Sequence, residues 1–244
     1  MQVNQRVLFT TVGGYFAVAL TLALLSLAPE PMRSHQELFR DGAKATLELT
    51  FLASLFGLIF GLIIAWIRFF SIPFLYRMAT FFLDIIRGTP LLVQILFAYY
   101  ALPLFLPQLS LNEFWAATIA LSFNVAAYHS EVIRGGMLSI PKGQWDAAHV
   151  LGFNRRQAFQ WVIWPQSLRV MLPGLVCNTV ALLKDSALAS SIGLLELSLA
   201  GNRVTSETFQ PTKVLLTVAL IYFVFSSIVT RLGIVLESGF RWAP

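Results

Sequence analysis

Long apolar stretches separated by short polar segments dominate this chain. Six stretches approach or exceed the roughly 20 residues that a helix needs to cross a bilayer core about 30 Å thick. They are Val7–Ala28, Ala45–Ile67, Thr89–Phe105, Glu113–Ile133, Ser167–Ile192 and Lys213–Leu236. Because lipid offers no partner for backbone N–H and C=O groups, each stretch is predicted to be an α-helix. The pattern therefore predicts an all-α, polytopic membrane helix bundle with about six transmembrane helices.

The first and third stretches differ from a plain span. Val7–Ala28 is longer than the roughly 7–15 apolar residues of a signal peptide, so we expect it to be retained. Thr89–Phe105 is short, and the preceding Phe81–Ile86 is also apolar, with Asp84 and Arg87 beside it. This combination predicts a helix that lies in the membrane interface, is ended by Gly88 and Pro90, and is followed by a span that bends inward.

Small residues mark a predicted close contact in the second stretch. Gly57 and Gly61 form a G-x-x-x-G pattern, which lets another helix approach closely. The contact could lie within one bundle or between two subunits.

Composition supports an integral membrane protein, because 57% of the residues are hydrophobic, 12% are charged and the mean hydropathy is +0.73. The net charge of +5 is therefore interpreted as topology and not as nucleic-acid binding. One side of the predicted bundle holds Arg6, Arg68, Arg77, Arg87, Arg134, Lys142, Arg155, Arg156, Arg169, Arg231 and Arg241, and the other holds Arg33, Arg40, Lys44, Arg203 and Lys213. The excess predicts that the first side, with both termini and residues 141–165, is cytoplasmic.

Several kinds of chemistry have no sequence support. The chain contains no G-x-x-x-x-G-K-[ST] loop for cradling phosphate, so we expect it to bind no ATP itself. His35, His129 and His149 lie on separate segments and Cys177 is the only cysteine, so no metal site is expected. We therefore predict neither an enzyme nor a cofactor in this chain.

The polar segment 141–165 is predicted to form two short helices. Trp145, Ala148 and Gly152 recur near helical spacing and give one face an aromatic anchor beside small residues. Pro141 would start the first helix, Gly152 would end it, and Gln157–Ile163 would form the second. The residues expected to contact a partner are Trp145, Asp146, Ala147, Ala148, Gly152, Arg155 and Arg156. The alternative is a solvated loop whose basic residues merely follow the positive-inside bias.

Five segments, in order, resemble the amino-acid-type permeases of binding-protein-dependent ABC importers. They are Ala45–Leu49, Ile86–Gln94 (I-R-G-T-P-L-L-V-Q), Ala127–Gly136 (A-Y-H-S-E-V-I-R-G-G), Asp146–Gly152 followed by Pro165, and Leu182–Ser190 (L-L-K-D-S-A-L-A-S). The fourth resembles the family's EAA loop, although Asp146 replaces the usual Glu and Trp164 the usual Leu. The resemblance covers Ala45 to Leu236.

This resemblance implies a type I ABC importer permease with a five-helix core, to which Val7–Ala28 adds one helix. Residues 1–44 would hold that helix and an extracytoplasmic connector, residues 45–237 the permease domain and residues 238–244 a tail. It also implies that the chain imports a polar amino acid across the bacterial cytoplasmic membrane by alternating access. ATP and Mg²⁺ would bind a separate ATPase dimer that docks on residues 141–165. The other partners would be a second permease subunit, identical or paralogous, an extracytoplasmic amino-acid-binding protein and membrane lipid.

Polar side chains inside the predicted spans are candidates for the substrate path, because charged groups in a membrane usually face a cavity or a partner. Asn124, Tyr128 and Glu131 share one helix face by their spacing. In the next span, Asn178 and Asp185 are likewise seven residues apart, with Lys184 beside Asp185. The candidates are Asn124, Tyr128, Asn178, Lys184 and Asp185. Alternatively, these groups bond one another and hold the bundle together, and Glu131 is expected to pair with Arg134.

Two other functions are the alternatives to an importer subunit. A secondary transporter or channel would work without an ATPase and would have no use for the polar segment. A membrane-embedded enzyme would need a cluster of His and acidic residues at one membrane face, which the sequence lacks.

Overall fold

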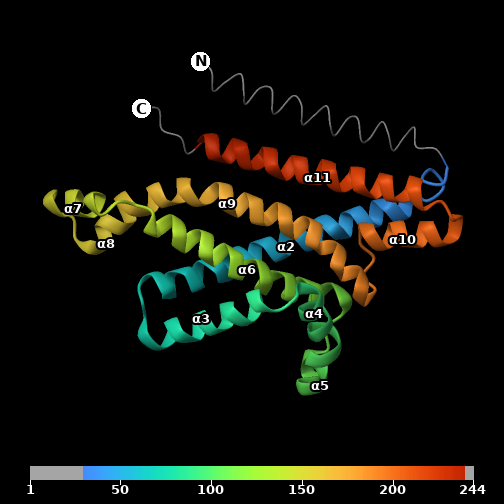
Figure 1. Cartoon of the computed structure of the whole chain (residues 1–244), viewed down its shortest axis with the longest axis horizontal. Coiled ribbons are helices and arrows are strands. Elements are labelled where there is room, and N and C mark those ends of the chain that lie inside the picture. Colours follow the sequence, from blue (N-terminus) through green and yellow to red (C-terminus); the bar gives the residue numbers. More distant parts are fainter. Residues whose placement is uncertain (1–29, 240–244) are drawn as a thin grey trace, which may run out of the picture.

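The computed structural model describes residues 30–239, which form an elongated array of helices with no strand among them (Figure 1). The helices are α2 (Gln36–Phe69), α3 (Pro73–Gly88), α4 (Leu91–Leu96), α5 (Leu102–Phe105), α6 (Glu113–Leu138), α7 (Lys142–Val150), α8 (Arg155–Ala158), α9 (Trp164–Asp185), α10 (Leu197–Thr208) and α11 (Pro211–Gly239). Short 3-10 or π segments, Phe97–Ala101, Pro107–Leu109, Phe159–Ile163 and Ser186–Ile192, join some of them. The prediction of an all-α fold is confirmed.

Within the described residues, three helices are long and apolar enough to cross a membrane. They are α2, the continuous stretch Arg155–Ile192, and α11. Helix α3 and the stretch Leu91–Phe105 add a fourth span if they are taken as one bent span, and the bend between them is 106°. The predicted span Val7–Ala28 lies outside the described residues.

Helix α6 contains the remaining predicted span, but it does not meet the same apolar criterion. Its 26 residues would extend about 39 Å, which is long enough to cross. However, it carries Asn124, His129 and Glu131. The first two are buried, because α2 and α9 pack along α6 and keep much of its polar surface away from lipid.

Among the described helices, α2 and α6 form the most extensive contact, and this contact depends on small residues. A Cβ atom on Gly57 would overlap Val125 Cγ1 and lie 3.2 Å from the Ser122 carbonyl oxygen. One on Gly61 would lie 2.9 Å from His129 Cβ. The G-x-x-x-G pattern therefore serves packing within this chain.

Replacing Gly57 by valine is expected to push α2 and α6 apart. Overpacking of this kind lowers the free energy of unfolding by about 1–3 kcal/mol, measurable by thermal unfolding in detergent. Gly135→Val is the matched control, because nothing lies within 4 Å of a Cβ built on that α6 glycine. Equal losses in both variants would contradict the packing role of Gly57.

Hydrogen bonds at and beside the buried Glu196 join the amino-terminal half of α2 to α10 and α11. Glu196 is fully buried and accepts hydrogen bonds from the backbone N–H groups of Ser198 and Leu199, at 2.7 Å each. It also accepts from the Tyr222 hydroxyl at 2.8 Å. Thr46 Oγ1 in α2 accepts from the Leu197 N–H at 3.1 Å. Helix α10 is thereby capped and fixed to two of the long helices.

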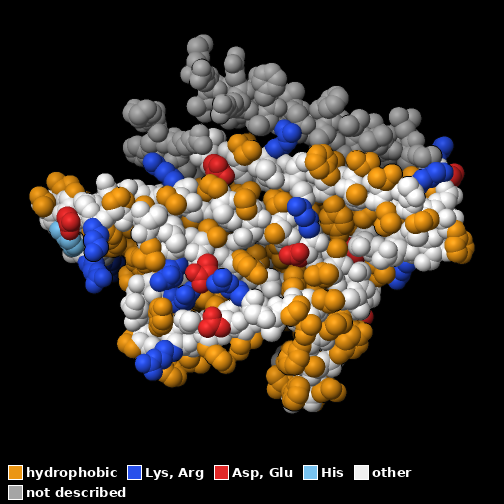
Figure 2. Space-filling model, viewed as in Figure 1, with side chains coloured by type: hydrophobic (Ala, Val, Ile, Leu, Met, Phe, Trp, Pro, Cys, Tyr) orange, Lys and Arg blue, Asp and Glu red, His pale blue; other side chains and the backbone are white. Residues whose placement is uncertain are grey.

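The outer surface is largely apolar, as expected for a protein in lipid. Figure 2 shows hydrophobic side chains covering the α4–α5 arm that projects from the body. Leu104 and Phe105 at its tip are 80% and 73% exposed.

Candidate functional site

The polar segment 141–165 forms a protruding helical hairpin at one end of the fold (Figure 1). Helix α7 starts directly after Pro141, as predicted. Gly152 has φ of +84°, a left-handed conformation that side chains rarely adopt, and it ends the helical turn. The Trp145 ring stacks on Phe159 with centroids 6.4 Å apart. Phe159 also packs against Phe69 and Phe70, so an aromatic cluster joins the hairpin to the end of α2.

Of the three residues that sequence spacing placed together as a partner surface, Trp145 and Ala148 are turned inward. Ala148 is only 2% exposed, and Trp145 is half-buried against Phe159. The expectation that Ala148 itself contacts a partner is therefore wrong, because its own chain covers it. Asp146 and Ala147 are exposed, as are Gly152, Arg155 and Arg156.

Two apolar residues at the tip were missed by sequence reasoning. Val150 is 88% exposed and Leu151 is 77% exposed. Both lie at the end of a segment that is otherwise polar, and this apolar pair in a polar segment is the sequence signal that could have identified them. The spacing of Trp145, Ala148 and Gly152 instead predicted a partner surface on the opposite face.

The second helix of the hairpin is not a separate element, contrary to the prediction for Gln157–Ile163. Asn154 and Gln157 form a reciprocal capping box at the start of α8. Helix α8 then continues through the π turn Phe159–Ile163 directly into α9. The hairpin is thereby joined to a transmembrane helix without an intervening loop.

The predicted bend lies at the corner between α3 and α4. Thr89 adopts an extended conformation and Pro90 precedes α4, so the helix stops and restarts at 106°. Gln94 closes the corner, because its Nε2 donates to the carbonyl oxygens of Ile86 at 2.8 Å and Thr89 at 3.1 Å.

A cavity of about 460 Å³ lies beside this corner, between α4, α6 and α9. Its lining residues are Thr89, Pro90, Leu91, Asn124, Val125, Tyr128, Asn178, Ala181, Leu182, Asp185 and Leu188. Four of the five residues proposed from sequence for the substrate path are thus brought together, although they come from two helices. The Asn124 amide donates to Gln94 Oε1 at 3.2 Å, and Asn178 Nδ2 lies 3.4 Å from His129 Nδ1.

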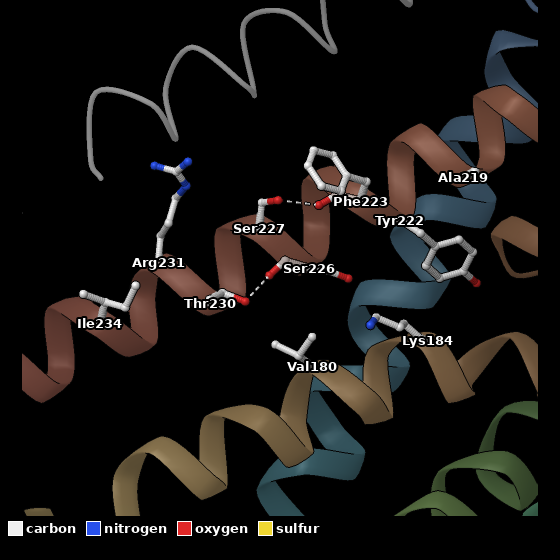
Figure 3. A pocket seen from close by; sticks show the side chains of 10 residues that line it. All are labelled: Val180, Lys184, Ala219, Tyr222, Phe223, Ser226, Ser227, Thr230, Arg231 and Ile234. Atoms are coloured by element: carbon white, nitrogen blue, oxygen red, sulfur yellow. Dashed lines mark hydrogen bonds between the residues drawn. The ribbon is translucent and has the colours of Figure 1, made fainter. Parts of the chain in front are cut away.

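Lys184 is the exception among the predicted path residues. It lines a different groove of about 730 Å³ between α9 and α11. Figure 3 shows its side chain directed toward the α11 side, near Tyr222 and Ser226. The neighbours Lys184 and Asp185 therefore face different spaces, and the five residues do not form one site.

Glu131 pairs with two arginines, and neither is the expected Arg134. Its Oε1 accepts from Arg68 Nη1 at 2.6 Å and from Arg87 Nη1 at 3.2 Å. Arg68 is 9% exposed and also lies over the Tyr76 ring. The carboxylate thus joins the ends of α2 and α3 to α6, which the sequence could not reveal because the three elements lie far apart along the chain.

The histidines do not gather into a site. Among residues 30–239 no group of three His, Cys, Asp or Glu side chains could hold a metal ion. His35 lies at the start of α2, where Nδ1 contacts the Pro31 carbonyl oxygen at 2.8 Å and Nε2 contacts Glu207 at 3.0 Å. The hydrogen bond to the Pro31 carbonyl, with a further contribution from Glu207, raises the pKa of His35. This pair joins the connector to α10.

Residues 57–242 match the family described as binding-protein-dependent transport system inner membrane component. The chain is 35% identical over 190 residues to the glutamine transport system permease protein GlnP of Escherichia coli (strain K12), covering 78% of this chain and 87% of that one. It is 34% identical over 220 residues to the L-cystine transport system permease protein TcyB of Bacillus subtilis (strain 168), covering 90% and 93%.

Solved structures show the same arrangement of helices. A crystal structure of an amino acid ABC transporter with histidines contains a chain that superposes with a TM-score of 0.79. That chain is 36% identical, and the match covers 85% of this chain and 96% of the other. An inward-facing methionine ABC transporter, 21% identical, superposes with a TM-score of 0.74 over 88% of this chain and all of the other, which supports the fold alone.

Proposed function

The chain belongs to the family of binding-protein-dependent transport inner membrane components, and from this premise we propose that its 460 Å³ cavity is a station on the path of a polar amino acid. The protein is a permease subunit of an amino-acid ABC importer, integral to the inner membrane, and is not itself an enzyme. Its relatives carry glutamine and L-cystine, so the substrate class here is a polar amino acid.

The observation that carries this proposal is the meeting of Asn124, Tyr128, Asn178 and Asp185 around one cavity. Polar groups converging in an otherwise apolar bundle can replace the water that an amino acid loses on entering the membrane. The cavity also adjoins the Gly88–Pro90 corner, where the chain direction changes. Movement of α4 at this corner would alter the shape of the cavity.

The α7–α8 hairpin is proposed to dock on a separate ATPase. Its exposed tip carries Asp146, Ala147, Val150 and Leu151, a mixture of charged and apolar side chains suited to a protein interface. ATP and Mg²⁺ would bind that ATPase. Closure of an ATPase dimer would move the hairpin and, through the continuous α8–α9 helix, one wall of the cavity.

Topology and assembly follow from the same proposal. The hairpin and the carboxyl end of α11 would face the cytoplasm, and α10 would face a binding protein outside. Two permease subunits, identical or paralogous, would pair above the ATPase dimer.

Asp185→Leu and Tyr128→Leu test the cavity. Each variant is expected to lower uptake about tenfold or more, because each removes a polar partner of the substrate, while co-purification with the ATPase stays at the wild-type level. Ser227→Leu is the control, since Ser227 lines the other groove. Unchanged uptake in both cavity variants would rule out this path.

A further inference from the structure

Gln94, a residue of the α3–α4 corner, has its side-chain amide held in one direction. Its Nε2 contacts the carbonyl oxygens of Ile86 and Thr89, and Thr89 Oγ1 at 3.0 Å. A carbonyl oxygen can only accept, so the nitrogen end of the amide must face the corner. The oxygen end of Gln94 therefore points away from the corner, toward α6.

Asn124 takes its own direction from Gln94. Its Nδ2 donates to Gln94 Oε1 at 3.2 Å, and the reverse orientation would place two oxygens against each other. The Asn124 oxygen Oδ1 must then point away from Gln94. Within residues 30–239 this oxygen has no hydrogen-bond partner, and the atom is not fully enclosed by protein. It is thus open to the cavity that Asn124 lines.

The cavity therefore presents hydrogen-bond acceptors without a basic side chain. Asp185 contributes a carboxylate to its wall, and none of its described lining residues is Lys or Arg. Lys184 faces the other groove. An ammonium group is a donor of three hydrogen bonds and a cation, which complements such a wall. A carboxylate placed against the Asn124 oxygen and Asp185 would meet other acceptors, whereas Tyr128 and Asn178, elsewhere in the lining, can also donate.

We propose that Gln94 is a positioning residue that aims the Asn124 oxygen into the cavity, so that Asn124 and Asp185 together bind the ammonium group of the transported amino acid. This inference rests on the proposed function of the cavity. Beyond that function, it states that the cavity binds the ammonium end of the substrate and that Gln94, outside the cavity wall, orients a binding residue.

The test measures binding to the assembled permease–ATPase complex in nanodiscs without a binding protein. The probes are labelled L-glutamine, L-arginine and L-cystine. The N-acetyl derivative of the amino acid that binds most tightly is then added as a competitor. Gln94→Met is expected to raise the Kd of that amino acid about tenfold, since a charge-assisted hydrogen bond is lost. The N-acetyl derivative, which has no ammonium group, is expected not to compete. Gln108→Met, on an exposed residue, should leave the Kd unchanged.

A double-mutant comparison separates positioning from a merely structural role. If Gln94 acts through Asn124, then Gln94→Met should have no further effect on the Kd in an Asn124→Leu background. Additive effects, or competition by the N-acetyl derivative equal to that of the amino acid, would overturn the inference. If the Gln94→Met complex fails to assemble, Asn124→Leu alone tests the inference. It must raise the Kd of the amino acid about tenfold, and an unchanged Kd would overturn the inference. A wild-type complex that neither binds nor transports any probe would remove the proposed function as well.

Discussion

Replacing Val150 and Leu151 together by aspartate is expected to abolish co-purification with the ATPase and to lower transport about 100-fold or more. Both side chains are largely exposed at the tip of the hairpin, so the substitution removes little internal packing. Two carboxylates in a desolvated interface would cost several kcal/mol, and about 2.7 kcal/mol already corresponds to a hundredfold loss. The measurement is recovery of the ATPase with a tagged permease, together with uptake.

Phe209→Asp is the matched control for this prediction. Phe209 is 85% exposed at the end of α10, away from the hairpin, and its left-handed conformation suits aspartate. It should leave ATPase recovery unchanged. Full ATPase recovery with the Val150 and Leu151 double variant would show that the tip is not the docking surface.

Removing the Glu131 carboxylate is expected to have the largest effect on stability. Glu131→Ala leaves the Arg68 guanidinium buried without a counter-charge, which should lower the free energy of unfolding by about 2–4 kcal/mol. Arg87→Ala should cost about 0–1 kcal/mol, because Arg87 is 47% exposed and water screens its charge. Thermal or denaturant unfolding in detergent measures both.

A paired substitution checks the cause. If the loss in Glu131→Ala arises from an unpaired buried charge, then Arg68→Met combined with Glu131→Leu should recover most of it, because two apolar side chains need no partner. A double variant less stable than Glu131→Ala would mean that the ion pair itself, and not the orphaned arginine, determines the stability of this joint.

Local sequence signals predicted those features that depend on local chemistry. Pro141 and Gly152 bound α7 because a proline start and a left-handed glycine end are local preferences. The Gly88–Pro90 corner follows for the same reason. Asn124 and Tyr128 lie one helical turn apart, so their shared face was accessible from spacing alone.

The remaining features depend on contacts between distant segments. Lys184 and Asp185 are neighbours, and only the rotation of α9 against α6 and α11 decides which of them faces the cavity. Arg68 and Arg87 reach Glu131 because α3 folds back beside α6, whereas Arg134 on the same helix was the obvious partner. Ala148 faces inward because Trp145 stacks on Phe159, a residue beyond the turn. The direction of the Asn124 amide likewise depends on a corner some thirty residues earlier.

The most direct test of the central claim is uptake into proteoliposomes that contain this chain with its ATPase, a second permease subunit and a binding protein. The account predicts uptake of one polar amino acid that requires ATP and is lost with the Val150 and Leu151 double variant. Uptake by this chain alone, without ATPase and unaffected by that variant, would contradict the account and indicate a secondary transporter.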